Sequence, residues 1–147
     1  MRAAEMLVRA ARVDDAEAVA RLFGQLGYPS TPGELRARLV DTGAAVRALV
    51  AEREGRVVGI VVVNLIAPLH VPGRWAIVSA LVTDEAARGA RIGAALLGEA
   101  ERYAREQGCS RVELSSSDSR TRAHAFYLQQ GFEEVRKRFV KFIQPMC

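Results

Sequence analysis

Apolar and polar positions change their spacing several times along the chain, and each change predicts a new element. "MLVRAARV" alternates apolar and polar residues, which predicts a strand from Met6 to Ala10. In "DDAEAVARLFGQLGY" the apolar residues recur at helical spacing, and "STPGELRARLV" predicts a second, short helix. Asp14 or Asp15 can cap the first helix, and Ser30 or Thr31, followed by Pro32, can begin the second.

The middle of the chain is dominated by apolar runs that predict strands. In "AVRALVAEREGRVVGIVVVNLI" two apolar segments flank "EREGR", where Gly55 can take the positive φ that a tight hairpin requires. "VVGIVVV" is rich in β-branched residues, which indicates a strand covered on both faces. "APLHVPG" contains two prolines and is predicted to be a loop, and "WAIVSALVT" is predicted to be another buried strand that ends at Thr83.

The last third returns to helical spacing twice. A helix is predicted from Ile92 to a stop at Gly108, followed by a strand in "SRVELSS". "TRAHAFYLQQ" predicts a helix that Gly131 ends, and "FEEVRKRFVKFI" a closing strand or strand pair. The expected fold is therefore mixed α/β, with helices on both sides of a central sheet. No repeat or linker interrupts the pattern, so we expect one domain over residues 1–147.

Composition narrows the class of protein. Two cysteines, Cys109 and Cys147, make neither a disulfide framework nor a zinc cluster, so we expect a cytoplasmic protein without a metal. The longest apolar stretch, Val57–Leu69, is interrupted and too short for a membrane span. The net charge of +4 suits nucleic acid or a polyanionic cofactor. Only 6% of the residues are aromatic, which argues against the stacking platforms of a nucleic-acid binder.

The stretch "AARGARIGAALL" places glycines and arginines directly before a predicted helix. Glycine turns expose backbone N–H groups, and a helix N-terminus carries partial positive charge, so this pattern predicts an anion site. The stretch lacks the lysine and hydroxyl residue of a P-loop and the spacing of a dinucleotide fingerprint. The alternative interpretation is an ordinary loop whose arginines are solvated.

A second motif follows at a fixed distance. "TRAHAFYLQQGF" contains the pattern A-x-x-F-Y…G-F at Ala123, Phe126, Tyr127, Gly131 and Phe132. Together the two motifs resemble the GCN5-related N-acetyltransferase (GNAT) family, over roughly residues 75–142, and the earlier part of the chain fits more loosely. Within that family the chain is most similar to acetyltransferases of small amines, such as aminoalkylphosphonates and aminoglycosides. The resemblance implies a mostly antiparallel sheet and acetyl-CoA as co-substrate.

The resemblance also implies a donor site. The backbone of the strand end should lie along the pantetheine arm, and the turn with the start of the next helix should hold the pyrophosphate. Two positions depart from the family pattern, because Arg91 replaces a glycine of the turn and Arg120 replaces a common asparagine. The implied donor-site residues are Leu81, Val82, Thr83, Arg88, Gly89, Ala90, Arg91, Ile92, Gly93, Ala94, Arg120, Ala123 and Phe126.

The resemblance implies a residue for the general acid, whereas the general base stays open. Tyr127 lies where the family often places the residue that protonates the departing thiolate, although a packed aromatic residue is the simpler interpretation. Relatives often carry a glutamate on the strand before the turn, but here that strand reads "AIVSALV". The general base therefore stays open among Ser79, His70, Glu113, Asp118 and water.

These observations predict an enzyme that transfers an acetyl group from acetyl-CoA to a primary amine by direct attack in a ternary complex. We expect a small-molecule acceptor, bound where residues 24–33 and 67–73 meet at the end of the central strands. A protein amine as acceptor, a catalytically idle acyl-CoA-binding module and a homodimer remain alternatives. We expect neither nucleic acid nor a membrane as a partner.

Overall fold

The computed structural model of the chain describes residues 5–87, 91–115, 121–135 and 138–145. These residues form two compact units, which divide between Leu114 and Ser115. The first unit contains the sheet and the helices that cover it, and the second contains helix α4 (Thr121–Gln129). The expectation of one domain over residues 1–147 stays a prediction.

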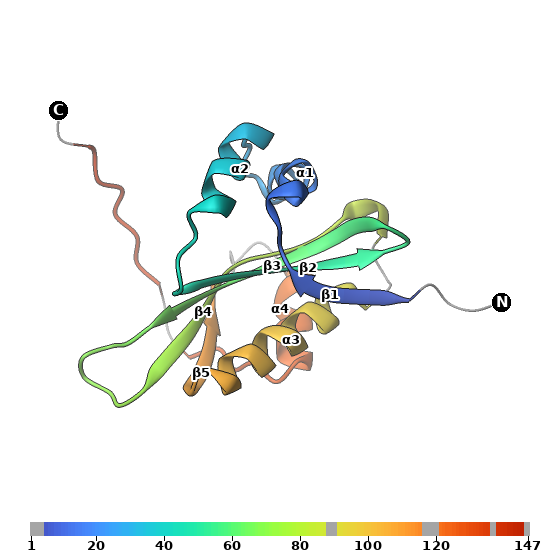
Figure 1. Cartoon of the computed structure of the whole chain (residues 1–147). Coiled ribbons are helices and arrows are strands. Elements are labelled where there is room, and N and C mark those ends of the chain that lie inside the picture. Colours follow the sequence, from blue (N-terminus) through green and yellow to red (C-terminus); the bar gives the residue numbers. More distant parts are fainter. Residues whose placement is uncertain (1–4, 88–90, 116–120, 136–137, 146–147) are drawn as a thin grey trace. The chain divides into compact units, whose positions relative to one another are not determined.

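A sheet in the strand order β1-β2-β3-β4-β5 forms the centre of the first unit (Figure 1). From β1 to β4 each strand pairs antiparallel with the next, whereas β4 and β5 are parallel. Parallel neighbours need a long crossover, which α3 (Ile92–Glu106) provides. The predicted mixed, mostly antiparallel sheet is confirmed. The strands are β1 (Met6–Ala10), β2 (Val46–Arg53), β3 (Arg56–Ile66), β4 (Arg74–Thr83) and β5 (Cys109–Leu114).

The hairpin between β2 and β3 forms at the predicted glycine. Glu54 and Gly55 have φ values of 53° and 77°, and Arg53 pairs with Arg56 across the turn. Two successive left-handed residues give the turn the twist of the flanking strands, which is why a glycine is needed here.

Helices cover both faces of the sheet, with α1 (Ala16–Leu26) and α2 (Pro32–Val40) on one face and α3 on the other (Figure 1). Successive residues of a strand point to opposite faces, so Ile60 packs in the α1 cluster whereas Gly59 faces α3. One core cluster lies between α1, α2 and the sheet, and its buried members include Val19, Leu22, Leu35, Val50, Ile60 and Val82.

One predicted helix cap is confirmed and the other is wrong. Thr31 accepts a hydrogen bond from the backbone N–H of Glu34 at 3.1 Å, and Pro32 begins α2. Asp15 occupies the N-cap position of α1 but makes no side-chain cap hydrogen bond there. Its backbone is already helical, with φ −83° and ψ −1°, because a 3₁₀ turn at Val13–Asp15 leads into α1, and its carboxylate instead accepts from the Arg12 N–H and from an arginine side chain.

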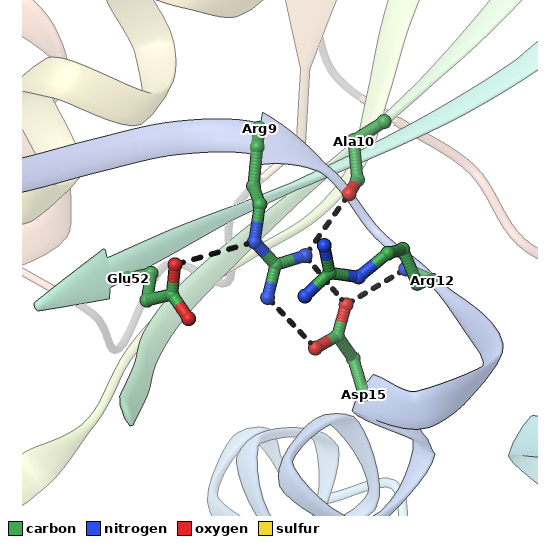
Figure 2. A network of polar contacts seen from close by, with 5 residues as sticks. All are labelled: Arg9, Ala10, Arg12, Asp15 and Glu52. Carbon is green, nitrogen blue, oxygen red and sulfur yellow. Dashed lines mark hydrogen bonds and ion pairs between the residues drawn. The ribbon is translucent and has the colours of Figure 1, made fainter. Parts of the chain in front are cut away.

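That arginine is Arg9, which ties β1 to the start of α1 (Figure 2). Its guanidinium donates to both Asp15 oxygens, at 2.8 Å and 3.0 Å, and to Glu52 on β2 at 3.5 Å. The backbone N–H of Arg12 donates to Asp15 at 2.7 Å. The hydrogen bonds that Arg9 donates to Asp15 hold the pKa of Asp15 below its ordinary value and raise the pKa of Arg9.

The second unit corrects the prediction of a closing strand. Residues 132–135 and 138–145, the described part of this segment and the residues that follow it, form no strand. Beyond Phe132 the large apolar side chains described in this segment are exposed, with Phe139 at 90% and Phe142 at 92%. Alternating side chains specify the two faces of a strand but not its partner, and an unpaired strand leaves its own N–H and C=O groups unsatisfied.

Candidate functional site

β4 loses one of its two neighbours halfway along its length. β5 pairs with β4 from Arg74 to Val78, and this pairing ends where Leu114 lies opposite Val78. β4 continues to Thr83 and stays paired with β3, up to Thr83 opposite Gly59. Within the described part of the first unit, Ser79–Thr83 therefore has no strand on its β5 side. Such an edge presents backbone N–H and C=O groups to an extended ligand.

A β-bulge lies at the point of divergence. Val62 pairs with Ala80 and Val63 with Val78, so Ser79 is the extra residue. A bulge bends its strand and increases the local twist, and this one lies directly after Val78, the last residue of β4 that pairs with β5. Asn64 of β3 donates to the Ser79 hydroxyl at 2.7 Å and fixes its side chain.

At the far end of β4 the start of α3 packs tightly on the sheet. A Cβ atom on Gly59 would lie 2.9 Å from Ile92 Cγ2, 2.9 Å from Leu96 Cδ1 and 3.1 Å from the Val82 carbonyl oxygen. Ile92 and Leu96 are buried. Gly59 thus allows the first turn of α3 to lie directly beside the exit of β4. We did not identify this residue in the sequence, although an isolated glycine within a strand often marks such a close approach.

The first turn of α3 has the properties of an anion site. Its leading N–H groups, at Ile92, Gly93 and Ala94, have no partner within the helix, and the helix start is positively polarised. No acidic residue lies in this turn. Arg91 precedes it in the left-handed region, with φ 61° and ψ 25°, and is exposed. The conformation is one that favours glycine, which is the residue the family pattern has at this position.

A buried carboxylate connects α1 to the exit of β4. Asp84 directly follows β4 and accepts hydrogen bonds from the Ala86 N–H at 3.1 Å, from Arg21 at 3.2 Å and from Gln25 at 3.3 Å. The bond from the Ala86 N–H is the main cause that lowers the pKa of Asp84, and Gln25 and Arg21 add to it. Sequence analysis missed Asp84. A charged residue directly after a buried strand was the available signal.

In the second unit the A-x-x-F-Y…G-F motif forms one helix end. Gly131 has φ 93°, and the Phe132 N–H donates to the Tyr127 carbonyl oxygen at 3.0 Å, which is the bond of a Schellman motif. The Tyr127 ring lies 5.6 Å from the Phe126 ring and 6.1 Å from the Phe132 ring, between ring centroids. The spacing of the motif thus places both phenylalanine rings against the tyrosine ring.

A family model described as the acetyltransferase (GNAT) family matches residues 10–132. The chain is also 32% identical, over 91% of its length and 89% of the relative, to an aminoalkylphosphonate N-acetyltransferase of Salmonella typhimurium. The chain belongs to the GNAT acetyltransferase family. It is an N-acetyltransferase of a family that uses acyl-CoA, so the predicted family and class of enzyme are confirmed.

Two solved structures show how closely the GNAT fold is kept. A transcriptional regulator from Bacillus halodurans has a TM-score of 0.85 at 23% identity, over 95% of this chain and all of that one. An aminoglycoside N-acetyltransferase in complex with CoA has a TM-score of 0.83 at 18% identity, over 99% of this chain and 98% of that one. At these identities the likeness concerns the fold.

The residues that the GNAT resemblance implies for the donor site fall into four groups. Leu81, Val82 and Thr83 lie on the half of β4 that diverges from β5, and Arg91–Ala94 begin α3, so the structure brings these two groups together around Gly59. Ala123 and Phe126 lie on α4 of the second unit, with Tyr127. Arg88, Gly89, Ala90 and Arg120 lie outside the described residues.

The candidates for the general base are separated by the structure. Glu113 lies on β5 one residue before the pairing with β4 ends, opposite Ile77, with an arginine of the same strand, Arg111, 3.5 Å from its carboxylate. Ser79 lies at the bulge. His70 packs edge-on against Trp75 at 5.6 Å, before the start of β4. Asp118 lies outside the described residues. Of the candidates that the structure describes, Glu113 and Ser79 lie where the pairing of β4 with β5 ends.

The predicted acceptor site is wrong in one respect. Residues 24–33 and 67–73 were expected to meet at one end of the central strands. Gln25 contacts Asp84 beyond the C-terminal end of β4, whereas the loop with His70 precedes its N-terminal end. Nine steps of about 3.3 Å separate these ends by about 30 Å. The sequence does not show which end of β4 the segment after α1 reaches, because that is set by a contact between residues about sixty positions apart.

Among the described residues, no helix has the length and apolar content needed to cross a membrane. The same residues contain no group of three or more His, Cys, Asp or Glu side chains placed to hold a metal ion.

Proposed function

We propose that this GNAT enzyme transfers the acetyl group of acetyl-CoA to a primary amine of a small molecule, within a complex that holds both substrates. The observation that carries the proposal is the open half of β4, Ser79–Thr83, which leads directly to the N-terminus of α3. An extended, amide-containing arm that ends in a pyrophosphate needs both features, in this order.

The open edge of β4 receives the pantetheine arm. Leu81, Val82 and Thr83 offer their backbone groups to its amides, as a neighbouring strand would. The bulge at Ser79 marks the inner end of this edge. An N–H near Val82 is then available to stabilise the oxyanion that forms during transfer.

The start of α3 receives the pyrophosphate. The free N–H groups at Ile92–Ala94 and the helix dipole supply favourable interactions with negative charge. The GNAT resemblance adds Arg88, Gly89 and Ala90 of the turn. Arg91 brings a further guanidinium to the same place, and the chain as a whole carries a net charge of +4, which favours a polyanionic donor.

The reaction requires two proton transfers. The neutral amine nitrogen attacks the thioester carbonyl carbon, a C–N bond forms, and the carbonyl oxygen becomes negative. When the C–S bond breaks, the departing thiolate takes up a proton, and the GNAT resemblance assigns Tyr127 as the donor of that proton. The amine proton leaves to Glu113 or, through water, to solvent, and we favour Glu113 over His70 because it lies beside the divergence of β4 and β5.

The acceptor is proposed by likeness. A relative that covers almost the whole chain at 32% identity is an aminoalkylphosphonate N-acetyltransferase, so we place a small amine with an anionic group first among the substrates. The excess of basic residues is compatible with such an acceptor. We propose the cytoplasm as the compartment, because acetyl-CoA and reduced cysteines occur together there.

An acetylation screen tests the proposal. Purified protein is incubated with acetyl-CoA and a panel of aminoalkylphosphonates, aminoglycosides, polyamines and peptides, and release of free thiol is measured. We expect turnover with small amines. Acetylation of peptides alone would contradict the acceptor class, and CoA binding without any turnover would indicate the idle module.

Tyr127→Phe tests the assigned acid in the same assay. The substitution keeps the ring and its packing against Phe126 and Phe132 but removes the hydroxyl. Turnover should fall by about 10²–10⁴-fold, the usual contribution of general acid–base catalysis, while CoA affinity is unchanged. If the folded variant keeps wild-type turnover, Tyr127 is not the general acid and serves only in packing.

A further inference from the structure

The exit of β4 is held by a cluster of polar contacts that no step of the proposed reaction uses. We define the Asp84 junction as Asp84 together with Arg21 and Gln25 of α1. Asp84 is 5% exposed and lies between the last residue of β4 and the short 3₁₀ helix η2 (Glu85–Ala87). The junction is therefore located between the two halves of the proposed donor site.

The backbone on both sides of Asp84 is fixed by this junction. The Asp84 N–H donates to the Val58 carbonyl oxygen at 2.8 Å, which extends the pairing of β3 and β4 by one residue. Its side chain accepts from the Ala86 N–H at 3.1 Å, and its carbonyl oxygen accepts from the Ala87 N–H at 2.9 Å. Strand and 3₁₀ helix thus share one anchor at Asp84.

α1 holds the same segment from the opposite side. The Gln25 amide donates to Asp84 at 3.3 Å, and its oxygen accepts from the Glu85 N–H at 3.0 Å. Arg21 donates to Asp84 at 3.2 Å and to the Val57 carbonyl oxygen at 2.9 Å. Arg21 and Gln25 are one helical turn apart, so one face of α1 holds the start of β3 and the exit of β4 together.

The alternative role is general stability, as for any buried carboxylate. That role does not account for the division of the contacts. Gln25 binds the Glu85 N–H and Asp84 binds the Ala86 N–H, so two successive amides that β3 does not pair are each given a side-chain acceptor. Contacts of this kind fix the direction in which the chain leaves the sheet.

We infer that the Asp84 junction is a positioning device that holds residues 84–87, at the exit of β4, in place for donor binding, so that its loss weakens donor binding more than turnover. The inference rests on the proposed function for the identity of the donor. Its physical basis is that a segment already ordered before binding does not lose backbone entropy when the ligand binds.

The test compares three variants with the wild type by calorimetry with CoA and by steady-state kinetics. Asp84→Ala should raise the Kd for CoA and the KM for acetyl-CoA about tenfold, with kcat within about twofold. Gln25→Leu keeps the size of the side chain but removes both of its contacts, and should act in the same direction. Asp84→Asn keeps an oxygen for the Ala86 N–H and should recover most of the affinity.

Asp15→Ala is the matched control, because Asp15 is 6% exposed and also hydrogen-bonded to an arginine and a backbone amide. A folded Asp84→Ala protein with wild-type affinity, or an equal loss of affinity in Asp15→Ala, would overturn the inference. If Asp84→Ala does not fold, Gln25→Leu decides by the same criteria.

Amide hydrogen exchange separates this inference from the proposed function. Gln25→Leu should speed exchange at Glu85, and Asp84→Asn should leave it near the wild-type rate. If the wild type binds no CoA, the proposed donor fails, and exchange still tests the junction. Unchanged exchange at Glu85 in Gln25→Leu would overturn the junction even if the wild type binds CoA.

Discussion

Asp15 and Asp84 are buried to the same degree, with 6% and 5% exposed, but they connect the chain in different ways. Asp15 receives a pair of short bonds, at 2.8 Å and 3.0 Å, from one guanidinium only six positions away. Asp84 receives three longer bonds, from 3.1 Å to 3.3 Å, and two of them come from α1, about sixty positions earlier in the chain.

The difference teaches that a buried carboxylate is not by itself a sign of function. The bidentate pair of Asp15 and Arg9 joins the edge of the sheet to the start of α1, far along the chain from the GNAT motifs (Figure 2). The contacts of Asp84 are individually weaker but lie at the exit of β4. We therefore expect Asp15 to affect mainly the free energy of unfolding, and Asp84 mainly the affinity for the donor.

The largest expected effect follows from Asp15→Ala. The substitution leaves the Arg9 guanidinium, whose side chain is 14% exposed, without its main counter-charge. Removing one partner of such a pair should lower the free energy of unfolding by about 3 kcal/mol. Urea denaturation measures this loss, and CoA titration of the folded variant should give the wild-type Kd. If folded Asp15→Ala protein bound CoA with a higher Kd than the wild type, the contrast between the two aspartates would be lost.

Gly59→Ala tests whether the donor end depends on packing as well as on polar contacts. The new Cβ would lie 2.9 Å from two side chains of α3 and 3.1 Å from the Val82 carbonyl, so α3 must shift. We expect a loss of about 2 kcal/mol in unfolding free energy, as in other overpacked cores, together with weaker CoA binding.

The control for Gly59→Ala is Gly98→Ala. Gly98 lies within α3 and has open space at its Cβ, so alanine should stabilise the helix by about 0.5–1 kcal/mol. If both substitutions gave the same change in stability and affinity, close approach at Gly59 would not be the cause.

Acid should remove the contributions of both aspartates. Each has a pKa below its ordinary value of 3.8, so the stabilisation is fully present above about pH 4 and is lost as the pH falls through the lower folded-state pKa. Unfolding free energy measured between about pH 5 and pH 2 should decline less steeply in Asp15→Asn than in the wild type. If the two proteins gave parallel curves of unfolding free energy against pH, the pKa of Asp15 would not be lowered in the folded protein.

Arg91→Gly should have the smallest effect on stability, and it tests what the arginine in this left-handed conformation contributes to CoA binding. Glycine relieves the left-handed backbone at φ 61° but has a higher entropy when unfolded, so the free energy of unfolding should change by less than about 1 kcal/mol. If the guanidinium contacts phosphate, CoA affinity should fall about tenfold and more steeply at low salt. Unchanged affinity at low salt would show that Arg91 serves the turn alone.

Most elements of the fold could be predicted because their signals are local. Thr31 and Pro32 begin α2, Gly55 forms the hairpin and Gly131 ends α4, each through contacts within a few residues. The two GNAT motifs could be recognised for the same reason, since each keeps its residues within one short stretch. The predicted sheet class followed from the alternation of strands with helices and from the resemblance.

The rest depends on contacts between distant residues. The sequence contains Gly59 and Asp84 but not the fact that α3 lies against one and α1 against the other. The sequence also contains alternating apolar and polar side chains after Gly131, but it does not show which strand they would pair with. The described residues of this segment form no strand.

The sequence alone therefore determined most of the elements and the family, and it supplied the residues that we propose for the donor site. Only the tertiary structure decided that the pairing of β4 with β5 ends just before Ser79, and that Glu113 rather than His70 lies beside this point. It also decided that α1 holds the exit of β4. Strand pairing and buried hydrogen bonds are settled by which segments meet after chain closure, and neither spacing nor propensity within a segment contains that information.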